Sequence, residues 1–413
     1  MVQPTVPHRH PQESRGVRGT VMRKLSALLA TGVMVALVPL ALSACGGQGS
    51  AKGDTRQGHN KSESGGTAST SGQIVFRRWF DPDHTKGALF AMNPDGSHIR
   101  QITHPPKGWY DDNPAWSPDG QRVAFHRQGT DPYMSQITVL NLQTGDTREV
   151  THCGPDQGWT KEHPPPTSGH YCVSDFEAAF SPDGHSIAFR RILGPDETCC
   201  RIEGIWIIGL DGSDPHQVTN VDPKLPNAEF AEESAAFSPD GKTLVIDRVR
   251  RGQEAPKLVK LGEEEPYYHA AFVQSLDSSG SPEDAHRITP WNLNCQDHPE
   301  FSPDGELVLF RCLPKGEEGP SNLYWVHPDG TGLHALTHEE DADKQYLGSS
   351  FSPSFSGGEG WITAGRTSGY GDEGNADVFR LLIKDGEVAR SENLTKSAIW
   401  DSAPVWSSHP PVG

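Results

Sequence analysis

Arginine recurs at one position of a repeated segment, and its guanidinium groups are the feature of this chain best suited to chemistry. They follow the apolar residues of a predicted strand at Arg78, Arg127, Arg191, Arg248 and Arg366. Acids precede the first strand of several repeats, at Asp112, Asp175 or Glu177, Glu233, Asp297 and Asp401. A guanidinium can hold a carboxylate or phosphate through two parallel hydrogen bonds. One hypothesis is therefore that these arginines line a site that binds an anion. The alternative, which we expect, is that they form ion pairs with the acids of neighbouring repeats.

Other residue types that catalyse reactions or bind metals show no diagnostic spacing. The chain contains no Gly-x-Ser-x-Gly nucleophile motif and no glycine-rich phosphate loop before a helix. Its histidines are scattered, and His298, next to Asp297, is expected to be a polar residue lining a channel rather than a ligand. We therefore expect no cofactor and no metal.

A repeated phrase, aromatic-Ser-Pro-Asp-Gly, marks the elements that must position the arginines. It begins at Trp116, Phe180, Phe237 and Phe301, with degenerate copies at Phe355 and Trp406. Each repeat has four apolar segments separated by turn residues, as in 114–116, 122–125, 136–140 and 148–151. Four-stranded units that recur at a long period predict the blades of a β-propeller.

The number of blades follows from the apolar-Thr pair that closes each repeat. These pairs end at Thr103, Thr151, Thr219, Thr289, Thr337 and Thr395. Residues 74–103 supply three strands without an aromatic-Ser strand, whereas residues 403–407 supply only that strand. The sequence therefore predicts an all-β, six-bladed propeller in which the N- and C-terminal strands share one blade, with the C-terminal strand innermost.

These motifs together resemble the WD-like Pro-Asp repeat of TolB-type propellers, over residues 74–407. The resemblance implies a propeller outside the cytoplasm that takes part in a cell-envelope complex. The same repeat occurs in prolyl-oligopeptidase-type enzymes, but the nucleophile motif of that class is missing. The repeat by itself assigns no activity, because one fold hosts many functions.

The N-terminal region resembles a lipoprotein export signal. Residues 23–24 are basic, residues 25–42 are mostly apolar, and Leu-Ser-Ala-Cys45 is similar to a bacterial lipobox. We therefore predict a signal peptide over 1–45 with Cys45 as the lipidated residue, and translation could start at Met22. Residues 46–72 are rich in Gly and Ser and predict a flexible tether. Residues 73–409 form the propeller in this prediction.

Charge and cysteine usage agree with an exported domain. The net charge is −18, and the first 45 residues are basic, so the remaining chain is more acidic still and nucleic-acid binding is not expected. Six cysteines follow the lipobox, at Cys153, Cys172, Cys199, Cys200, Cys295 and Cys312. An even number outside the cytoplasm predicts disulfides. Cys295 would pair with Cys312. The other four cysteines either form Cys153–Cys172 and Cys199–Cys200, or Cys199 and Cys200 each bond to one of Cys153 and Cys172.

The connections between predicted strands are unequal in length. Ser-Pro-Asp-Gly and Asp-Gly turns fall on one face of the ring, and long connections fall on the other, at 152–175, 192–204, 220–233, 249–269 and 338–350. Long loops on a rigid scaffold commonly carry binding sites. We therefore expect a non-enzymatic, lipid-anchored monomer, attached to the membrane through the lipid only, that binds a cell-envelope protein or glycan at this face. The alternative is a propeller lyase or hydrolase acting on carbohydrate at the channel mouth.

Overall fold

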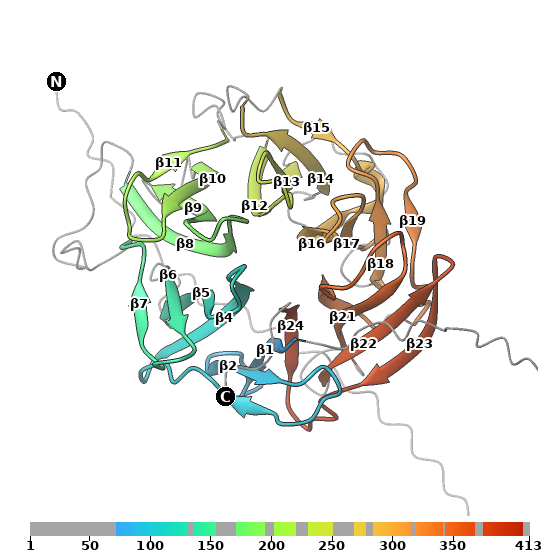
Figure 1. Cartoon of the computed structure of the whole chain (residues 1–413), viewed down its shortest axis with the longest axis horizontal. Helices are drawn as coiled ribbons and strands as arrows, with labels where there is room; N and C mark the ends of the chain where they lie inside the picture. The colour runs from blue at the N-terminus through green and yellow to red at the C-terminus, as the bar shows by residue number, and fades with distance from the viewer. Residues whose placement is uncertain are drawn as a thin grey trace, which may run out of the picture. The chain divides into compact units, whose positions relative to one another are not determined.

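The computed structural model is a ring of six four-stranded antiparallel sheets (Figure 1). It describes residues 72–129, 135–153, 171–194, 202–219, 230–250, 268–277, 284–314, 319–341, 343–367 and 375–407. The predicted signal peptide, Cys45 and the tether up to residue 71 lie outside these ranges. The chain divides into a unit of residues 1–64 and a unit of residues 65–413, and the ring belongs to the second.

Each blade contributes strands in the same order from the channel outward. The innermost strands are β24 (Asp401–Trp406), β4 (Trp109–Trp116), β8 (Tyr171–Phe180), β12 (Phe230–Phe237), β16 (Cys295–Phe301) and β20 (Tyr346–Phe351). The second strands are β1 (Ile74–Trp79), β5 (Arg122–Gly129), β9 (Ser186–Gly194), β13 (Thr243–Arg250), β17 (Val308–Cys312) and β21 (Gly360–Thr367). The third strands are β2 (Gly87–Met92), β6 (Ser135–Asn141), β10 (Ile202–Gly209), β14 (Tyr268–Ser275), β18 (Asn322–Val326) and β22 (Ala376–Lys384). The outer strands are β3 (Arg100–Gln101), β7 (Thr147–Glu149), β11 (His216–Gln217), β15 (His286–Arg287), β19 (His334–Ala335) and β23 (Glu387–Asn393).

The first blade joins the two ends of the propeller. Its strand order is β24-β1-β2-β3, and the register places Ile74 opposite Trp406. We number this sheet blade 1 and the following sheets, β4–β7 to β20–β23, blades 2 to 6. The predicted six-bladed propeller with a shared first blade and an innermost C-terminal strand is confirmed.

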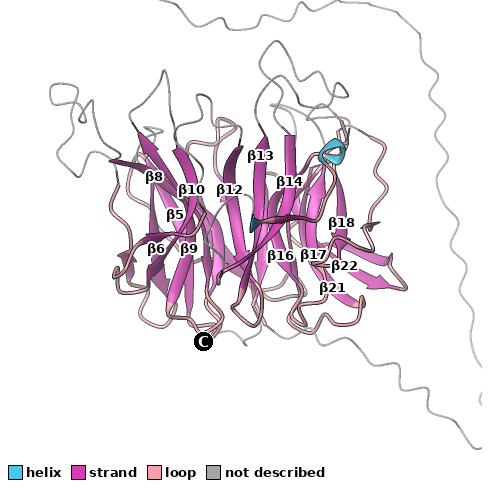
Figure 2. Ribbon diagram, turned by 90° about the horizontal axis from the view of Figure 1, so that it is seen from above, coloured by secondary structure: helices cyan, strands magenta, loops and turns pink. Residues whose placement is uncertain are grey.

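The Ser-Pro-Asp-Gly phrase is a turn stabilised by its own side chains. In blade 2, Ser117 Oγ donates to Asp119 Oδ1 at 2.5 Å and accepts from the backbone N–H of Arg122 at 2.9 Å. Gly120 adopts a φ of 65°, which favours glycine. The same Ser-to-Asp hydrogen bond recurs in blades 3, 4 and 5 at 2.6 Å. These turns lie on the lower side of Figure 2 and reverse the chain between the two inner strands of a blade.

The closing threonine is equally structural. In every blade its Oγ1 accepts a hydrogen bond from the backbone of the third strand; the donors are Leu89, Ile137, Ile205, Ala271, Leu323 and Val378. This bond satisfies an N–H beyond the end of each short outer strand. It explains why an apolar-Thr pair counts the blades.

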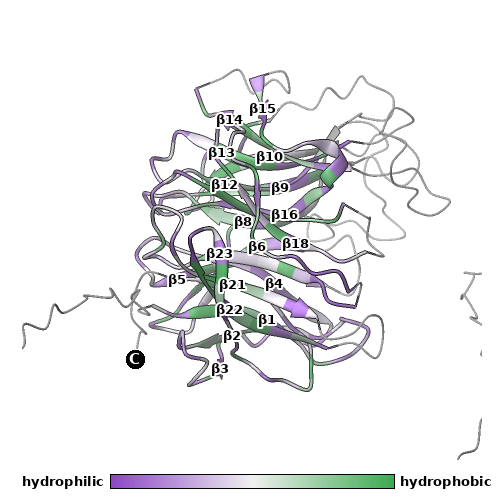
Figure 3. Cartoon of the chain, turned by 90° about the vertical axis from the view of Figure 1, so that its right-hand side faces the viewer, coloured by the Kyte–Doolittle hydropathy of each residue, from purple (hydrophilic) through white to green (hydrophobic). Residues whose placement is uncertain are grey.

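The hydrophobic core lies between neighbouring blades. One cluster joins Leu309 and Trp325 of blade 5 to Phe351 and Ile362 of blade 6, and another joins blades 3 and 4. Figure 3 shows hydrophobic colour concentrated along the strands and hydrophilic colour in the turns. Among the described residues there is no helix with the length and hydropathy needed to cross a membrane.

Candidate functional site at the channel mouth

The recurring arginines occupy one cross-strand position, which we call the clamp position. There a residue near the start of the innermost strand faces a residue near the end of the second strand. The opposed pairs are Asp401 and Arg78, Asp111 and Arg127, Asp175 and Arg191, Glu232 and Arg248, Cys295 and Cys312, and Tyr346 and Arg366. Both strand ends lead into the longer connections, so the clamp position lies next to the long-loop face.

Four of these arginines form ion pairs within their own blade. Arg191 donates from Nε and Nη2 to the two carboxylate oxygens of Asp175, both at 2.8 Å. The contacts of the other blades are similar: Arg78 with Asp401 at 2.6 and 2.7 Å, Arg127 with Asp111 at 2.7 and 2.9 Å, and Arg248 with Glu232 at 2.7 and 3.2 Å. All four carboxylate side chains are fully buried. The ion pairs that we expected between blades are therefore found within blades.

Each clamp arginine also stacks on an aromatic ring. The guanidinium of Arg248 lies 4.5 Å from the ring centroid of Phe272, and that of Arg78 lies 4.7 Å from Phe90. Burial raises the pKa of Asp175 and of Asp401, and the hydrogen bonds from their arginines oppose that rise. An external anion would have to displace a buried carboxylate to reach these groups.

Blades 5 and 6 depart from the pattern. The predicted Cys295–Cys312 disulfide is confirmed and occupies the clamp position of blade 5, with a Cα–Cα distance of 4.0 Å. In blade 6 the position opposite Arg366 is Tyr346, and the arginine pairs instead with Glu339 from the preceding connection. Cys153 is also disulfide-bonded, to a partner outside the described part of the chain. The side chains of Cys172, Cys199 and Cys200 are likewise outside it.

Ion pairs between blades do occur, one residue away from the clamp position. Arg77 Nη1 lies 2.5 Å from Asp112 Oδ1 and joins blades 1 and 2, and Arg190 Nη2 lies 3.7 Å from Glu233 Oε1 and joins blades 3 and 4. Successive side chains of a strand point to opposite faces of the sheet. The residue before each clamp arginine therefore faces the next blade. The predicted acid Asp112 belongs to this layer, whereas the side chain of Asp297 is outside the described residues.

A polar group spans the central channel. Each innermost strand carries a β-bulge, and five of these bulges hold a left-handed residue three positions before the terminal aromatic: Asn113, Glu177, His298, Gly348 and Ala403. Because glycine and alanine occupy this position too, the left-handed backbone is a property of the repeat rather than of a reactive residue.

Three of the bulge residues are polar and bind one another. Asn113 Nδ2 donates to both carboxylate oxygens of Glu177 at 2.9 Å, and His298 Nε2 lies 2.8 Å from Glu177 Oε2. Burial acts to raise the pKa of Glu177, but the nearby His298 outweighs it and the net pKa is lowered. Glu177 thus links blades 2, 3 and 5 across the channel.

A cavity of about 280 Å³ lies beside this polar group. It is lined by the innermost strands from their bulges to their terminal aromatic residues, and the lining includes Ala179, Ala236 and Glu300. The cavity therefore lies in the half of the channel that is next to the Ser-Pro-Asp-Gly turns. Burial raises the pKa of Glu300 to about 8. Its nearest side-chain partner is the hydroxyl of Ser350, at 3.3 Å from Oε1.

A buried histidine packs near the same group. His126 is 3% exposed, and its Nδ1 has no hydrogen-bond partner among the described residues. Its ring lies edge-on to Phe176, with the centroids 5.2 Å apart. Burial lowers the pKa of His126, so the imidazole is neutral at pH 7. Sequence reasoning did not single out this residue, although it replaces an arginine in the layer that faces the next blade.

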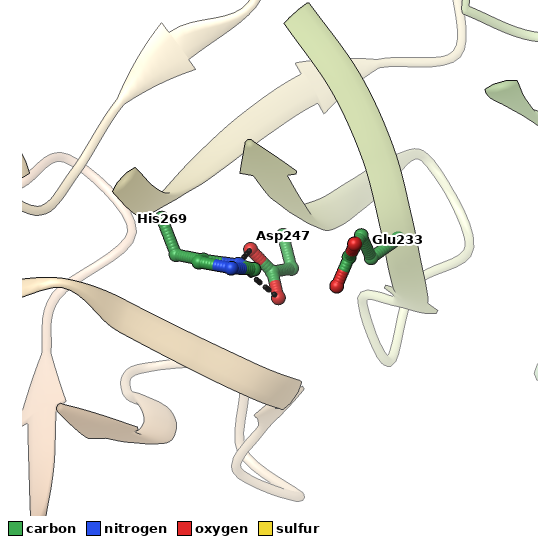
Figure 4. Close-up of side chains that lie close together, drawn as sticks. All are labelled: Glu233, Asp247 and His269. Carbon is green, nitrogen blue, oxygen red and sulfur yellow. Dashed lines mark hydrogen bonds and ion pairs between the residues drawn. The ribbon is translucent and has the colours of Figure 1, made fainter. Parts of the chain in front are cut away.

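One group of side chains in the described residues has the composition of a metal site. Glu233, Asp247 and His269 come from or adjoin the three inner strands of blade 4, and their ligand atoms lie within 4.8 Å of one another (Figure 4). His269 Nδ1 lies 3.0 and 3.2 Å from the carboxylate oxygens of Asp247. Burial acts to lower the pKa of His269, but Asp247 outweighs it and the net pKa is raised.

No protein-family model and no curated protein sequence matches the chain. Solved structures do match. Hydrazine synthase of Kuenenia stuttgartiensis gives a TM-score of 0.54 at 13% identity over 83% of this chain and 48% of that chain. A chain of a nidogen/laminin complex gives 0.50 at 9% identity over 82% of this chain and 100% of that chain. TolB from Acinetobacter baumannii gives 0.47 at 16% identity over 82% of this chain and 67% of that chain. At these identities the similarity identifies the fold alone, and it agrees with the six-bladed β-propeller seen in the strand order.

Proposed function

We propose that the mature protein is a lipid-anchored, extracytoplasmic propeller that binds a cell-envelope protein or glycan at its long-loop face. The observation that carries this proposal is the clamp position. It joins the two inner strands of five blades through an ion pair or a disulfide, at the strand ends from which the longer connections leave. A scaffold that is held rigid beneath its loops reduces the entropy that binding must overcome.

The binding face can be tested with paired variants of the full-length protein. One variant replaces residues 154–170 with a Gly-Ser linker of equal length, and the control changes the exposed tight-turn residue Lys242 to serine. Both proteins, with the wild type, are immobilised and exposed to solubilised envelope proteins and to purified envelope glycans. We expect one component to be retained by the wild type and the control but not by the loop variant. The proposal is contradicted if all three proteins retain the same component equally, or if none of them retains any component.

Membrane attachment is tested separately at Cys45. The wild type should partition into a detergent phase and carry a lipid mass, whereas Cys45→Ser should remain in the aqueous phase. If the wild-type protein carried no lipid, lipid anchoring at Cys45 would be contradicted. Ligand binding at the long-loop face would not be affected by that result.

A catalytic role is the second candidate, and the polar group in the channel favours it. Glu177 and His298 could exchange a proton, because His298 Nε2 lies 2.8 Å from Glu177 Oε2. Incubation with envelope polysaccharides, followed by size-exclusion chromatography of the products, tests this role. Depolymerisation that is lost in Glu177→Gln would establish an enzyme; unchanged polysaccharides would leave the binding function.

A further inference from the structure

We propose that Glu233, Asp247 and His269 bind a divalent transition-metal cation, with Zn²⁺ the best match to their chemistry. The imidazole nitrogen and two carboxylate oxygens are all ligands that zinc accepts. The proposal does not depend on which ligand binds at the long-loop face.

The backbone brings the three side chains together on rigid elements. Glu233 lies at the bulge of β12, Asp247 on β13 and His269 on β14, so each residue comes from a neighbouring strand of one blade. The register passes from Glu232 directly to Ser234, so Glu233 is the extra residue of the bulge. A bulge of this kind redirects a side chain. While Glu232 pairs with Arg248, Glu233 points toward Asp247 (Figure 4).

The distances suit a shared ion. Two ligand atoms that each lie about 2.0–2.2 Å from one zinc ion are at most about 4.4 Å apart. The ligand atoms of this group lie within 4.8 Å of one another, and His269 Nδ1 is 3.0 Å from Asp247 Oδ1. In the proposed site the Glu233 side chain would move closer to the other two ligands when the ion binds.

The local charge also favours a cation. Two carboxylates face one imidazole, and Asp247 and His269 are 2% and 9% exposed. Arg190 approaches Glu233 at 3.7 Å, which is longer than the contacts of 2.6 to 2.8 Å made by Nε of the clamp arginines Arg78 and Arg191. Arg311 acts on His269 electrostatically, but its Nη1 donates to the backbone oxygen of Tyr346 at 2.9 Å.

The competing explanation is a purely structural His269–Asp247 ion pair in which Glu233 has no part. The two explanations differ in what Glu233 does. As a ligand it should determine metal affinity, whereas in the structural explanation its removal leaves any metal affinity unchanged.

The test titrates chelator-treated, dialysed full-length protein with Zn²⁺ by isothermal calorimetry and by thermal melting. We expect one ion per chain with micromolar or tighter affinity and a higher melting temperature with zinc. Glu233→Gln and Asp247→Asn should each weaken binding at least tenfold while folding normally, as judged by circular dichroism. His338→Gln is the matched control, because His338 is an exposed histidine 3.9 Å from Glu387; it should bind as the wild type does.

Three results would overturn the proposal. The first is no saturable binding by the wild type at millimolar Zn²⁺. The second is equal affinity in the wild type, Glu233→Gln and Asp247→Asn, which would mean adventitious binding elsewhere. A preference for Ca²⁺ over Zn²⁺ would contradict the transition-metal assignment, since calcium takes oxygen ligands.

Discussion

Blades 4 and 5 hold their two inner strands together by different chemistry at the same register. In blade 4 Glu232 pairs with Arg248, whereas in blade 5 Cys295 is bonded to Cys312. Both residue pairs face each other across the innermost and second strands. A disulfide offers no guanidinium to a ligand, so the property that the two blades share is a cross-link. The comparison indicates that the clamp arginines serve the scaffold first.

The two cross-links differ in what happens when one partner is lost. The ion pair depends on both charges, because each side chain is almost fully removed from water: Arg248 is 2% and Glu232 0% exposed. A disulfide has no charge to leave behind, and its stabilisation is usually assigned to restriction of the unfolded chain. Single substitutions should therefore be more damaging in blade 4 than in blade 5.

The largest expected effect is that of Arg248→Met. It leaves the Glu232 carboxylate buried without its partner, and we expect the free energy of unfolding, measured by urea titration, to fall by roughly 3–5 kcal/mol. The double variant Glu232→Leu/Arg248→Met removes both charges and should recover most of that loss. If the single variant lost less than about 1 kcal/mol, the pair would not be a structural cross-link.

The next effect in size is removal of the disulfide. The sequence separation of Cys295 and Cys312 is 17 residues, and closing a loop of that length contributes about 3 kcal/mol in the chain-entropy model. We expect Cys295→Ala/Cys312→Ala to lower the free energy of unfolding, measured by urea titration, by about this amount. Replacing the pair with Cys295→Glu/Cys312→Arg should restore part of the stability. No recovery would mean that the two blades are not interchangeable at this position.

The sequence predicts the fold of the propeller better than it predicts the contacts of individual side chains. The repeat phrase gives the strand order and the register of each blade, so the six blades, the shared first blade and the Cys295–Cys312 bond could all be predicted. The ion-pair partners could not, because neighbouring residues such as Arg77 and Arg78 face opposite sides of the sheet, and the bulges shift the register of the acids. The group in blade 4 was missed because 14 and 22 residues separate its ligands. Besides Glu233, its visible signal is Asp247, where other blades carry arginine, histidine or glycine.

The smallest effect distinguishes the buried acids of the two blades. Glu300 in blade 5 lies beside the channel cavity and, among the described residues, has no ion-pair partner, unlike Glu232. Its pKa is raised by burial from 4.5 to about 8. The folded state therefore binds the proton more tightly than the unfolded state. The contribution of Glu300 to the free energy of unfolding is fully present below about pH 4.5, declines as the pH rises, and is lost above about pH 8.

Glu300→Gln should remove that dependence, because the amide stays neutral and can still accept a hydrogen bond from Ser350. We expect the variant and the wild type to have similar unfolding free energies at pH 5, and the variant to be the more stable of the two at pH 9. Urea titrations at both pH values measure the difference. A parallel decline in both proteins would mean that Glu300 is ionised in the folded state. The contrast between a charge-paired blade and a disulfide-linked blade with a neutral acid would then have to be abandoned.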